Sequence, residues 1–379
     1  MSEAGRAITE NQRSPWYIPD MPKAEAIIPY LREIDSNRWY TNYGALVQHL
    51  ESLLLEKFFA SKGELISTSS GTTALEISLK SLRLPQNTPI LVPSFTFPAT
   101  ISAIVSAGYT PLFCDIDRDS LALDIEKAKA VCAKRKDIGA IVVVCPYGRP
   151  INNKEWVELV SAQNIPVIVD AAAALGLQEC IDELIYCFSM HATKPFGVGE
   201  GGLIWTGNSS KANALRKMTN FGLDEGQVTH SGINAKLSEY HAAVGLAQLD
   251  RWADPSPRLS SLRTWFDCLT QNHAVQFAQP WASINERACL PMHILVRCSN
   301  TKSQLMKKLR ERFIGFKTSY LPPTHAHPAF SPHYVNTGTS DLEVTLEVAD
   351  RLIPLPHHNF LNNTDLNFVA SAIEQCLGT

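Results

Sequence analysis

Residues 138–170 read IGAIVVVCPYGRPINNKEWVELVSAQNIPVIVD, with an apolar run on either side of a helical pattern. The β-branched run at 138–145 and the run at 166–169 each have the length and composition of a buried strand. Between them, residues 153–163 predict a helix. A strand, a helix and a second strand in this order form a right-handed crossover, which joins parallel strands in one sheet. We therefore expect an α/β fold.

The same alternation of short apolar runs and longer amphipathic ones extends over about residues 65–206. On the N-terminal side of residues 138–170, residues 90–92 and 112–114 predict strands, while residues 99–107 and 121–134 predict helices. Strands that are apolar throughout lie buried on both faces, so we expect a mostly parallel central sheet covered by helices on both sides. Ligands of such sheets bind beyond the carboxyl ends of the strands, so polar residues there are candidate site residues.

The chain has 379 residues, which is enough for two domains with a sizeable core. A long helix is predicted at 237–252, and the sequence ADPSP at 253–257 is typical of a domain boundary. We expect a large domain over residues 1–250 and a smaller C-terminal α+β domain over residues 251–379. The elements expected in the smaller domain are a strand and two helices, at 293–297, 302–312 and 364–376.

The composition, 45% hydrophobic and 19% charged, is that of a soluble globular protein. The net charge is −3 and no basic cluster stands out, which argues against nucleic-acid binding. Residues 1–12 are polar, and the apolar runs are too short to span a membrane. The nine cysteines and eleven histidines lack the spacing of a metal site or a disulfide framework. We expect a cytoplasmic protein that binds no metal and no membrane.

Residues 69–74, SSGTTA, open a predicted helix on which Leu75, Leu79 and Leu82 recur at helical spacing. A turn of small residues at a helix start exposes free backbone N–H groups and the positive end of the helix dipole, and both favour a bound phosphate. Taken alone, the segment is explained more simply as an ordinary N-cap.

Two further residues have the chemistry of a cofactor site. Asp170 directly follows the strand at 166–169, where it can cap the alanine run after it or contact a ligand such as a pyridinium nitrogen. Lys194 lies between an apolar segment and the glycine-rich turn GEGG at 199–202. Desolvation there would lower its pKa and favour the neutral amine, which attacks aldehydes. The alternative for Lys194 is a surface lysine in a flexible loop.

Together these segments resemble the DegT/DnrJ/EryC1/StrS aminotransferases, which act on keto sugars linked to nucleotides. The resemblance extends from WYTN at 39–42 to the C-terminal helix, so it covers nearly the whole chain. It implies a pyridoxal-phosphate (PLP) dependent transferase of fold type I. The motifs that carry it are SGT at 70–72, VPSFTF at 92–97, DAA at 170–172, HATK at 191–194, GEGG at 199–202 and GINAKLSE at 232–239.

The resemblance also implies roles for individual residues. Lys194 would hold PLP as a Schiff base and carry a proton between cofactor and substrate, while Asp170 would pair with the pyridinium nitrogen. Phe97 would stack on the ring, although it could also be an ordinary core aromatic. The residues implied to bind the phosphate are Gly71, Thr72 and Ser189.

The remaining implied contacts involve the substrate and a second subunit. Asn234 would reach the phosphate of a neighbouring subunit, which implies a homodimer with shared active sites. Tyr320, His325 and Lys236 would lie near the sugar nucleotide, although a histidine in a proline-rich loop is more often a surface residue.

Two positions depart from the family pattern. Many members have a glutamine three residues after the aspartate, where it hydrogen-bonds the ring hydroxyl, and this chain has Ala173 there. Many also carry arginine where this chain has Lys236, which removes a bidentate fork for an anionic group.

The function implied is transamination of a nucleotide-linked keto-deoxy sugar, a 4-keto-6-deoxyhexose, with glutamate as amino donor. Three alternatives remain open at this point. The chain could aminate a free cyclitol or another small ketone, because a fold does not fix a substrate. It could be a pyridoxamine-phosphate-dependent sugar dehydratase, although those relatives have histidine in place of Lys194. It could also be a non-catalytic binding or regulatory protein.

Overall fold

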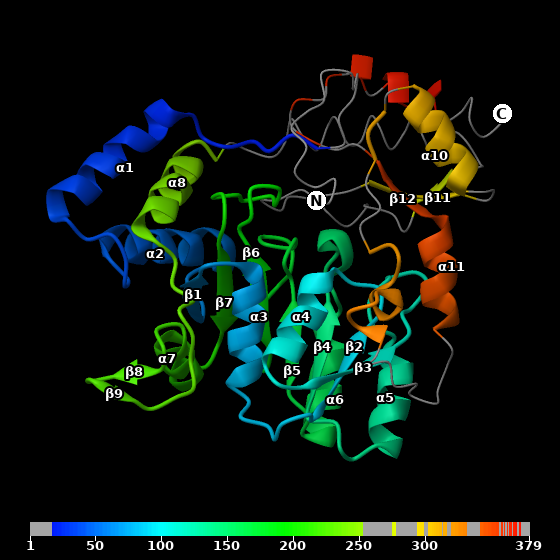
Figure 1. Ribbon diagram of the computed structural model, residues 1–379, viewed down its shortest axis with the longest axis horizontal. Helices are drawn as coiled ribbons and strands as arrows, with labels where there is room; N and C mark the ends of the chain where they lie inside the picture. The colour runs from blue at the N-terminus through cyan, green and yellow to red at the C-terminus, as the bar shows by residue number, and fades with distance from the viewer. Residues whose placement is uncertain are drawn as a thin grey trace.

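A computed structural model describes residues 17–252, 275–277, 294–298, 302–312, 314–316, 320–331 and 342–355, together with 358, 360, 362, 364–365, 367–369 and 371–372 (Figure 1). Its main feature is a seven-stranded sheet in the order β1-β7-β6-β5-β4-β2-β3. All neighbouring strands are parallel except β7, which runs antiparallel to both β6 and β1. The mostly parallel sheet is therefore confirmed. The strands are β1 (Glu64–Thr68), β2 (Pro89–Pro93), β3 (Thr110–Cys114), β4 (Ala140–Val144), β5 (Val167–Asp170), β6 (Ile185–Ser189) and β7 (Gly202–Thr206).

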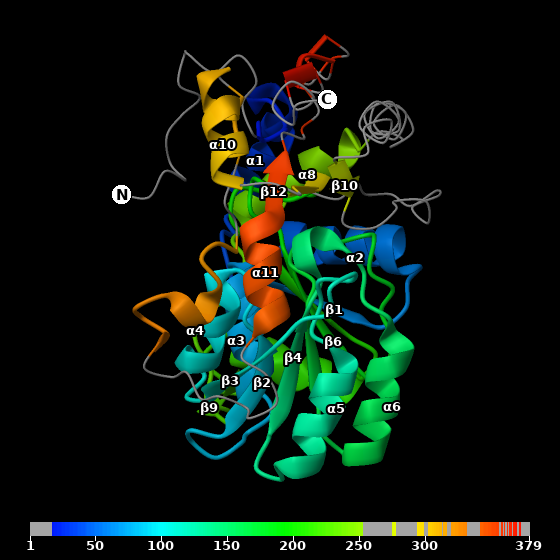
Figure 2. The same cartoon turned by 90° about the vertical axis from the view of Figure 1, so that its right-hand side faces the viewer.

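Helices cover both faces of this sheet, as Figure 2 shows for α3 and α4 on one side and α5 and α6 on the other. In β5, Val167 and Val169 belong to the buried cluster that includes residues of α2, α5 and α6, whereas Ile168 belongs to the cluster with α3, α4 and α7. Burying one such side chain contributes about 1.5–3 kcal/mol. The helices are α2 (Ala45–Phe59), α3 (Gly71–Lys80), α4 (Pro98–Ser106), α5 (Ile125–Lys134), α6 (Asn153–Gln163) and α7 (Ser209–Met218).

The predicted helix at 121–134 begins later than expected. It starts at Ile125 because the Asp124 side chain accepts the N–H groups of Glu126 and Lys127, at 2.9 and 3.0 Å, and so caps the helix. Leu121, which was expected to be helical, has a φ of 61°. The other predicted strands and helices of the sheet region agree with the structure to within about two residues, and α6 begins and ends as predicted.

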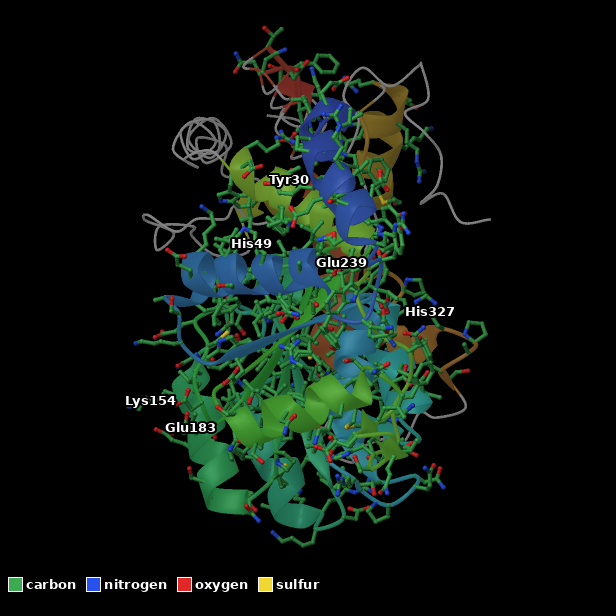
Figure 3. The ribbon with its side chains drawn as sticks, turned by 90° about the vertical axis from the view of Figure 1, so that its left-hand side faces the viewer. Tyr30, His49, Lys154, Glu183, Glu239 and His327 are labelled. Carbon is green, nitrogen blue, oxygen red and sulfur yellow. The ribbon has the colours of Figure 1, made fainter. Side chains whose placement is uncertain are left out.

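Helix α8 (Glu239–Asp250) packs against both α1 (Ala24–Asn37) and α2. Its predicted start at 237 was two residues early, because Ser238 caps it by accepting the N–H of His241. The buried carboxylate of Glu239 accepts the N–H groups of Leu46 and Val47 at 2.8 and 3.3 Å, and thereby caps α2 (Figure 3). Burial raises the pKa of Glu239.

The C-terminal part contains a three-stranded antiparallel sheet. The predicted strand at 293–297 and the helix at 302–312 are confirmed to within one residue. Seven residues of the predicted helix at 364–376 are described, at 364–365, 367–369 and 371–372, and all seven are helical. The proposed boundary at 253–257 lies outside the described residues, so the division at residue 250 stays a prediction. The elements of this part are β10 (Val275–Phe277), β11 (Ile294–Cys298), α10 (Lys302–Glu311), α11 (Glu343–Arg351) and β12 (Leu352–Leu355).

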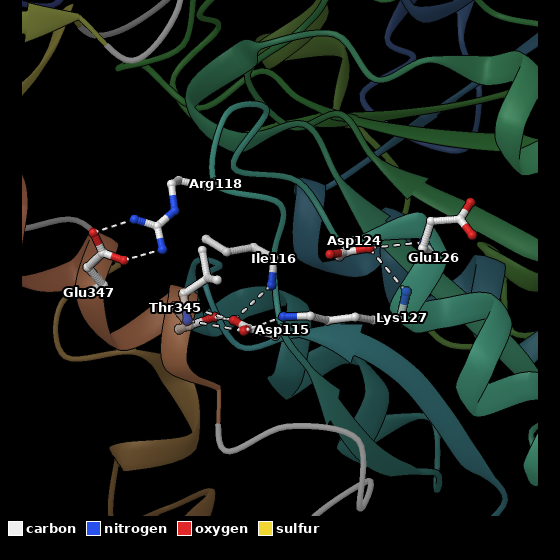
Figure 4. A network of polar contacts seen from close by, with 9 residues as sticks. Asp115, Ile116, Arg118, Asp124, Glu126, Lys127, Thr345 and Glu347 are labelled. Carbon is white, nitrogen blue, oxygen red and sulfur yellow. Dashed lines mark hydrogen bonds and ion pairs between the residues drawn. The ribbon is translucent and has the colours of Figure 1, made fainter.

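A buried carboxylate caps helix α11 at the end of β3, and the Arg118–Glu347 ion pair is a second link between this helix and the large sheet (Figure 4). Asp115 directly follows β3, and its Oδ1 accepts the N–H and the hydroxyl of Thr345, both at 2.8 Å. Its Oδ2 accepts the N–H of Val344 at 3.1 Å and the Lys127 ammonium at 2.7 Å. Burial alone would raise the pKa of Asp115, but the hydrogen bonds from Lys127 and Thr345 hold it below its ordinary value. Asp115 thus caps a helix that lies far away in the sequence.

None of the helices in the described ranges is long and apolar enough to span a bilayer. Within the same ranges, no group of three or more histidine, cysteine, aspartate or glutamate side chains is arranged to hold a metal ion.

Candidate active site

The predicted cofactor residues meet at the carboxyl edge of the sheet. Asp170, the last residue of β5, pairs with Cys187 of β6 and with Val144 of β4. Ser189 at the end of β6 pairs with Gly202, the first residue of β7, which also pairs with Thr68 at the end of β1. The turn before α3, the aspartate and the lysine loop after β6 therefore leave the sheet at the same edge.

The turn at the start of α3 has both a capping role and open donors. The Ser70 hydroxyl accepts the Thr73 N–H at 3.1 Å, and the Thr73 hydroxyl accepts the Ser70 N–H at 3.0 Å, so the N-cap interpretation is confirmed. Among the described residues, the N–H groups of Gly71 and Thr72 have no hydrogen-bond acceptor. A Cβ on Gly71 would lie 2.8 Å from the Ser189 Cβ, so glycine lets the turn approach Ser189 closely. These donors and the Ser189 hydroxyl suit a phosphate.

The Asp170 carboxylate is buried, with only 5% of the residue exposed, and both of its oxygens have partners. Oδ1 accepts the Ala172 N–H at 3.1 Å, so the aspartate does shape the turn after the strand. Oδ2 accepts the Thr100 hydroxyl at 2.6 Å. Burial raises the pKa of Asp170, while the hydrogen bonds from Thr100 and Ala172 and the charge of Lys194 act in the opposite direction.

Phe97 stands at the N-cap of α4 and is 50% exposed, so the alternative that it is a core aromatic is wrong. Its carbonyl accepts the Thr100 N–H at 3.1 Å. The first turn of α4 therefore carries both an exposed ring and the hydroxyl that binds Asp170.

Lys194 lies in a loop that is folded back on itself by backbone hydrogen bonds. The N–H groups of Met190 and Ala192 donate to the carbonyls of Gly201 and Gly199, each at 2.8 Å, and the Lys194 N–H donates to His191 at 2.8 Å. The lysine is half-buried, and its charge acts on the buried carboxylate of Asp170. This connection favours a site residue over a surface lysine.

The two predicted substrate residues from the C-terminal part are brought to the same edge. Tyr320 stacks on Tyr147, with ring centroids 4.4 Å apart, and burial and the charge of Asp170 raise its pKa. The His325 Nδ1 lies 2.5 Å from the hydroxyl of Ser94, which is the residue directly after β2. The Thr324 N–H donates to the Ser94 carbonyl at 2.9 Å and fixes this segment to the strand end. Burial lowers the pKa of His325, so the ring is neutral at neutral pH.

Asn234 and Lys236 lie in a segment beside the phosphate turn, since the Ser69 N–H donates to the carbonyl of Ala235 at 2.7 Å. Asn234 is exposed. The Lys236 ammonium donates to Asn220 at 2.6 Å and sits 4.8 Å above the Phe221 ring, and burial lowers its pKa. The Lys236 side chain is therefore held by the loop that follows α7.

The turn after β4 packs closely against the backbone of Ala173. Gly148 adopts a φ of +89°, and a Cβ there would lie 2.5 Å from the Ala173 carbonyl oxygen. The preceding residue, Tyr147, is buried and has a φ of 54°. Neither Tyr147 nor Thr100 was predicted from the sequence as a site residue. Only their position could have marked them as candidates, because both follow the carboxyl end of a predicted strand.

The residues at this edge fit PLP on chemical grounds. The open N–H groups of α3 suit its phosphate, the buried Asp170 carboxylate suits its ring nitrogen, and the exposed Phe97 suits its ring face. Lys194 is the amine beside them.

Comparisons with known proteins agree with this interpretation. The model of the DegT/DnrJ/EryC1/StrS aminotransferase family matches residues 22–374. A dTDP-4-amino-4,6-dideoxy-D-glucose transaminase of Escherichia coli is 32% identical over 354 residues, covering 91% of this chain and 93% of its own. Protein Rv3402c of Mycobacterium tuberculosis is 28% identical over 380 residues, covering 95% of this chain and 89% of its own.

A similar solved structure is that of a candidate PLP-dependent aminotransferase from Bacillus cereus. It is 27% identical, has a TM-score of 0.87, and matches 97% of this chain and 100% of its own. The chain therefore belongs to the DegT/DnrJ/EryC1/StrS family and is a PLP-dependent aminotransferase.

Proposed function

We propose that this aminotransferase moves an amino group from glutamate to the keto carbon of a nucleotide-linked deoxy sugar, a 4-keto-6-deoxyhexose. The observation that carries the proposal is the convergence of Asp170, Lys194 and the Gly71 turn with the segment that bears Tyr320 and His325. The name of the E. coli relative supports the substrate class.

In this proposal each residue has a defined task. PLP, when bound, supplies the electron sink for the reacting carbon. The Asp170 carboxylate keeps a proton on the ring nitrogen, and Phe97 covers one face of the ring. Lys194 moves a proton between the cofactor and substrate carbons, and such general acid–base catalysis typically contributes about 10²–10⁴-fold. The phosphate is anchored by Gly71, Thr72 and Ser189.

The substrate would be bound from the C-terminal segment. The neutral His325 and the hydroxyl of Tyr320 are hydrogen-bonding groups for a sugar, and Lys236 supplies one point charge for an anionic group. The dehydratase alternative is disfavoured by the lysine at position 194.

We also propose a homodimer in which Asn234 completes the phosphate site of the partner. Its support is the exposure of Asn234 together with that of Trp39, Tyr40 and Tyr240, which are 49%, 43% and 50% exposed. Single exposed aromatics are common, but a stacked pair such as Tyr40 and Tyr240, 6.2 Å apart, is typical of an interaction surface.

The test measures the two half-reactions separately. In the first step glutamate is added to PLP-loaded protein and 2-oxoglutarate is assayed. In the second step the protein that has reacted with glutamate is given keto sugars linked to dTDP, GDP or UDP, and the amino sugar is assayed. The Lys194→Ala variant should keep its fold and lose both half-reactions, whereas Lys211→Ala, on the exposed side of α7, should retain them. Full turnover by Lys194→Ala would overturn the catalytic assignment, and amination of a free cyclitol ketone alone would overturn the substrate class.

A further inference from the structure

Two buried hydroxyl groups are linked to Asp170 by consecutive hydrogen bonds. Thr96 and Thr100 are each only 1% exposed, and their Oγ1 atoms lie 2.7 Å apart. Thr100 also lies 2.6 Å from Asp170 Oδ2. The three side chains thus form one continuous hydrogen-bonded chain under the edge of the sheet where the cofactor residues meet.

The direction of this chain follows from the chemistry of its end. An ionised carboxylate only accepts hydrogen bonds, so Thr100 must give its single hydroxyl proton to Asp170. Thr100 can then only accept from Thr96, whose hydroxyl proton points towards it. Each bond polarises the next, which strengthens the last donor to the carboxylate.

We propose that Thr100 is a positioning residue that orients Asp170 and keeps it ionised for the cofactor's ring nitrogen, with Thr96 as its supporting donor. The inference rests on the role proposed for Asp170. The Ala172 N–H already holds Oδ1, so the Thr100 bond fixes the rotation of the carboxylate. One lone pair of Oδ2 remains for a ring N–H.

The position of Thr100 also couples two parts of the site. It lies in the first turn of α4, three residues after Phe97, whose carbonyl accepts its N–H. Pro98 at the first helical position fixes the geometry of this turn. The residue that would cover the ring and the residue that orients the carboxylate are therefore set by the same rigid turn.

The charge state of Asp170 is linked to titratable neighbours. Among the described residues, the titratable groups that act on Asp170 or are affected by it are Lys194, Tyr320, Cys145 and Cys187. Burial raises the pKa of Tyr320 and of both cysteines, so these three stay neutral at neutral pH. Against the burial of Asp170, the Thr100 hydroxyl, the Ala172 N–H and the charge of Lys194 favour the carboxylate.

The experiment measures the dissociation constant of PLP across a pH range, without any substrate, for Thr100→Val and Thr100→Ser. The valine variant keeps the shape but removes the hydroxyl, and should bind PLP roughly ten- to hundredfold more weakly. Because the lost bond favoured the ionised carboxylate, its PLP binding should also fail at a higher pH on acidification. The serine variant should restore both properties. Thr206→Val is the matched control, since Thr206 is equally buried but pairs with Ile185 at the opposite edge.

Unchanged binding and pH dependence in Thr100→Val would overturn the proposal, as would equal losses in the valine and serine variants. If Thr100→Val does not fold, Thr96→Val replaces it in the test. Thr96→Val should shift the pH dependence of PLP binding in the same direction, by a smaller amount than expected for Thr100→Val. Asp170→Asn separates this inference from the proposed function. Weaker PLP binding in Asp170→Asn beside unchanged binding in Thr100→Val would refute the role of Thr100 alone, whereas unchanged binding in both would refute the placement of Asp170.

Discussion

The Tyr320 ring lies parallel to that of Tyr147, with centroids 4.4 Å apart and an interplanar angle of 26°, although 173 residues separate the two. The Tyr147 N–H also points to the Tyr320 hydroxyl at 3.4 Å, and Phe95 meets the Tyr320 ring edge-on. The pair joins the C-terminal segment to the carboxyl end of β4, beside Asp170. It is therefore a structural link between the segment that carries Tyr320 and His325 and the residues proposed to bind PLP.

We predict that Tyr320→Leu mainly weakens the binding of the keto sugar. Stacked aromatic pairs contribute about 0.5–1.5 kcal/mol beyond their burial, so its KM should rise about two- to tenfold while the glutamate half-reaction stays near normal. Tyr320→Phe keeps the stacked ring but removes the hydroxyl proposed to bind the sugar, so it separates the contribution of the ring from that of the hydroxyl. An equal loss in the two half-reactions of Tyr320→Leu would show that the pair supports the cofactor instead.

A second prediction concerns the attachment of α11. Asp115→Asn removes the charge that binds Lys127 and weakens the cap on Thr345, so the free energy of unfolding should fall by about 2–3 kcal/mol at neutral pH. Urea unfolding measures this change. Asp137→Asn, which breaks the exposed pair with Arg135, should cost less than about 1 kcal/mol.

The same carboxylate predicts a pH dependence. The pKa of Asp115 lies below its ordinary value of 3.8, so its contribution to stability is present above that value and is lost as pH falls through the lower, folded-state pKa. The difference in stability between the parent protein and Asp115→Asn should therefore shrink in acid. A constant difference from neutral pH to below 3.8 would contradict the role of its charge.

How much of this site the sequence could predict depended on the range of the interactions. Asn152 caps α6 locally, accepting the Lys154 N–H, so the bounds of that helix followed from nearby residues. Asp170 was recognisable because it ends an apolar strand. The later start of α5 is also set locally, by the Asp124 side chain, and it was missed because the apolar pattern alone does not reveal a cap.

The contacts of Thr100 and Tyr147 could not be predicted in this way. Thr100 reaches Asp170 across 70 positions, and Tyr147 reaches Tyr320 across 173. Both depend on the order of the strands, which brings β2, β4 and β5 together and is fixed by packing of the whole sheet. The sequence indicated the edge at which a site forms, but not which hydroxyls and rings meet there.

A fourth prediction tests the phosphate turn. An alanine at position 71 would bring its Cβ within 2.8 Å of the Ser189 Cβ, so the turn must move away from the residue that shares its proposed ligand. Gly71→Ala should therefore weaken PLP binding at least tenfold, measured by equilibrium titration of the apoprotein. In Gly226→Ala the added Cβ would meet nothing within 4 Å, although the φ of +83° is strained. That control should lose stability without losing PLP affinity, and a similar affinity loss in both would point to a general effect.

The last prediction concerns the missing glutamine. Restoring it with Ala173→Gln places a long polar side chain at a position that is 5% exposed, where the carbonyl of residue 173 already packs against Gly148. Overpacking of this kind costs about 1–3 kcal/mol, so the variant should unfold at a lower urea concentration and bind PLP no more tightly than the parent. Ala133→Gln, on the exposed face of α5, should be near neutral. Tighter PLP binding by Ala173→Gln would instead mean that the turn at Tyr147 can move and that the glutamine can contact the cofactor. The close packing of Gly148 would then not explain why this chain has alanine at position 173.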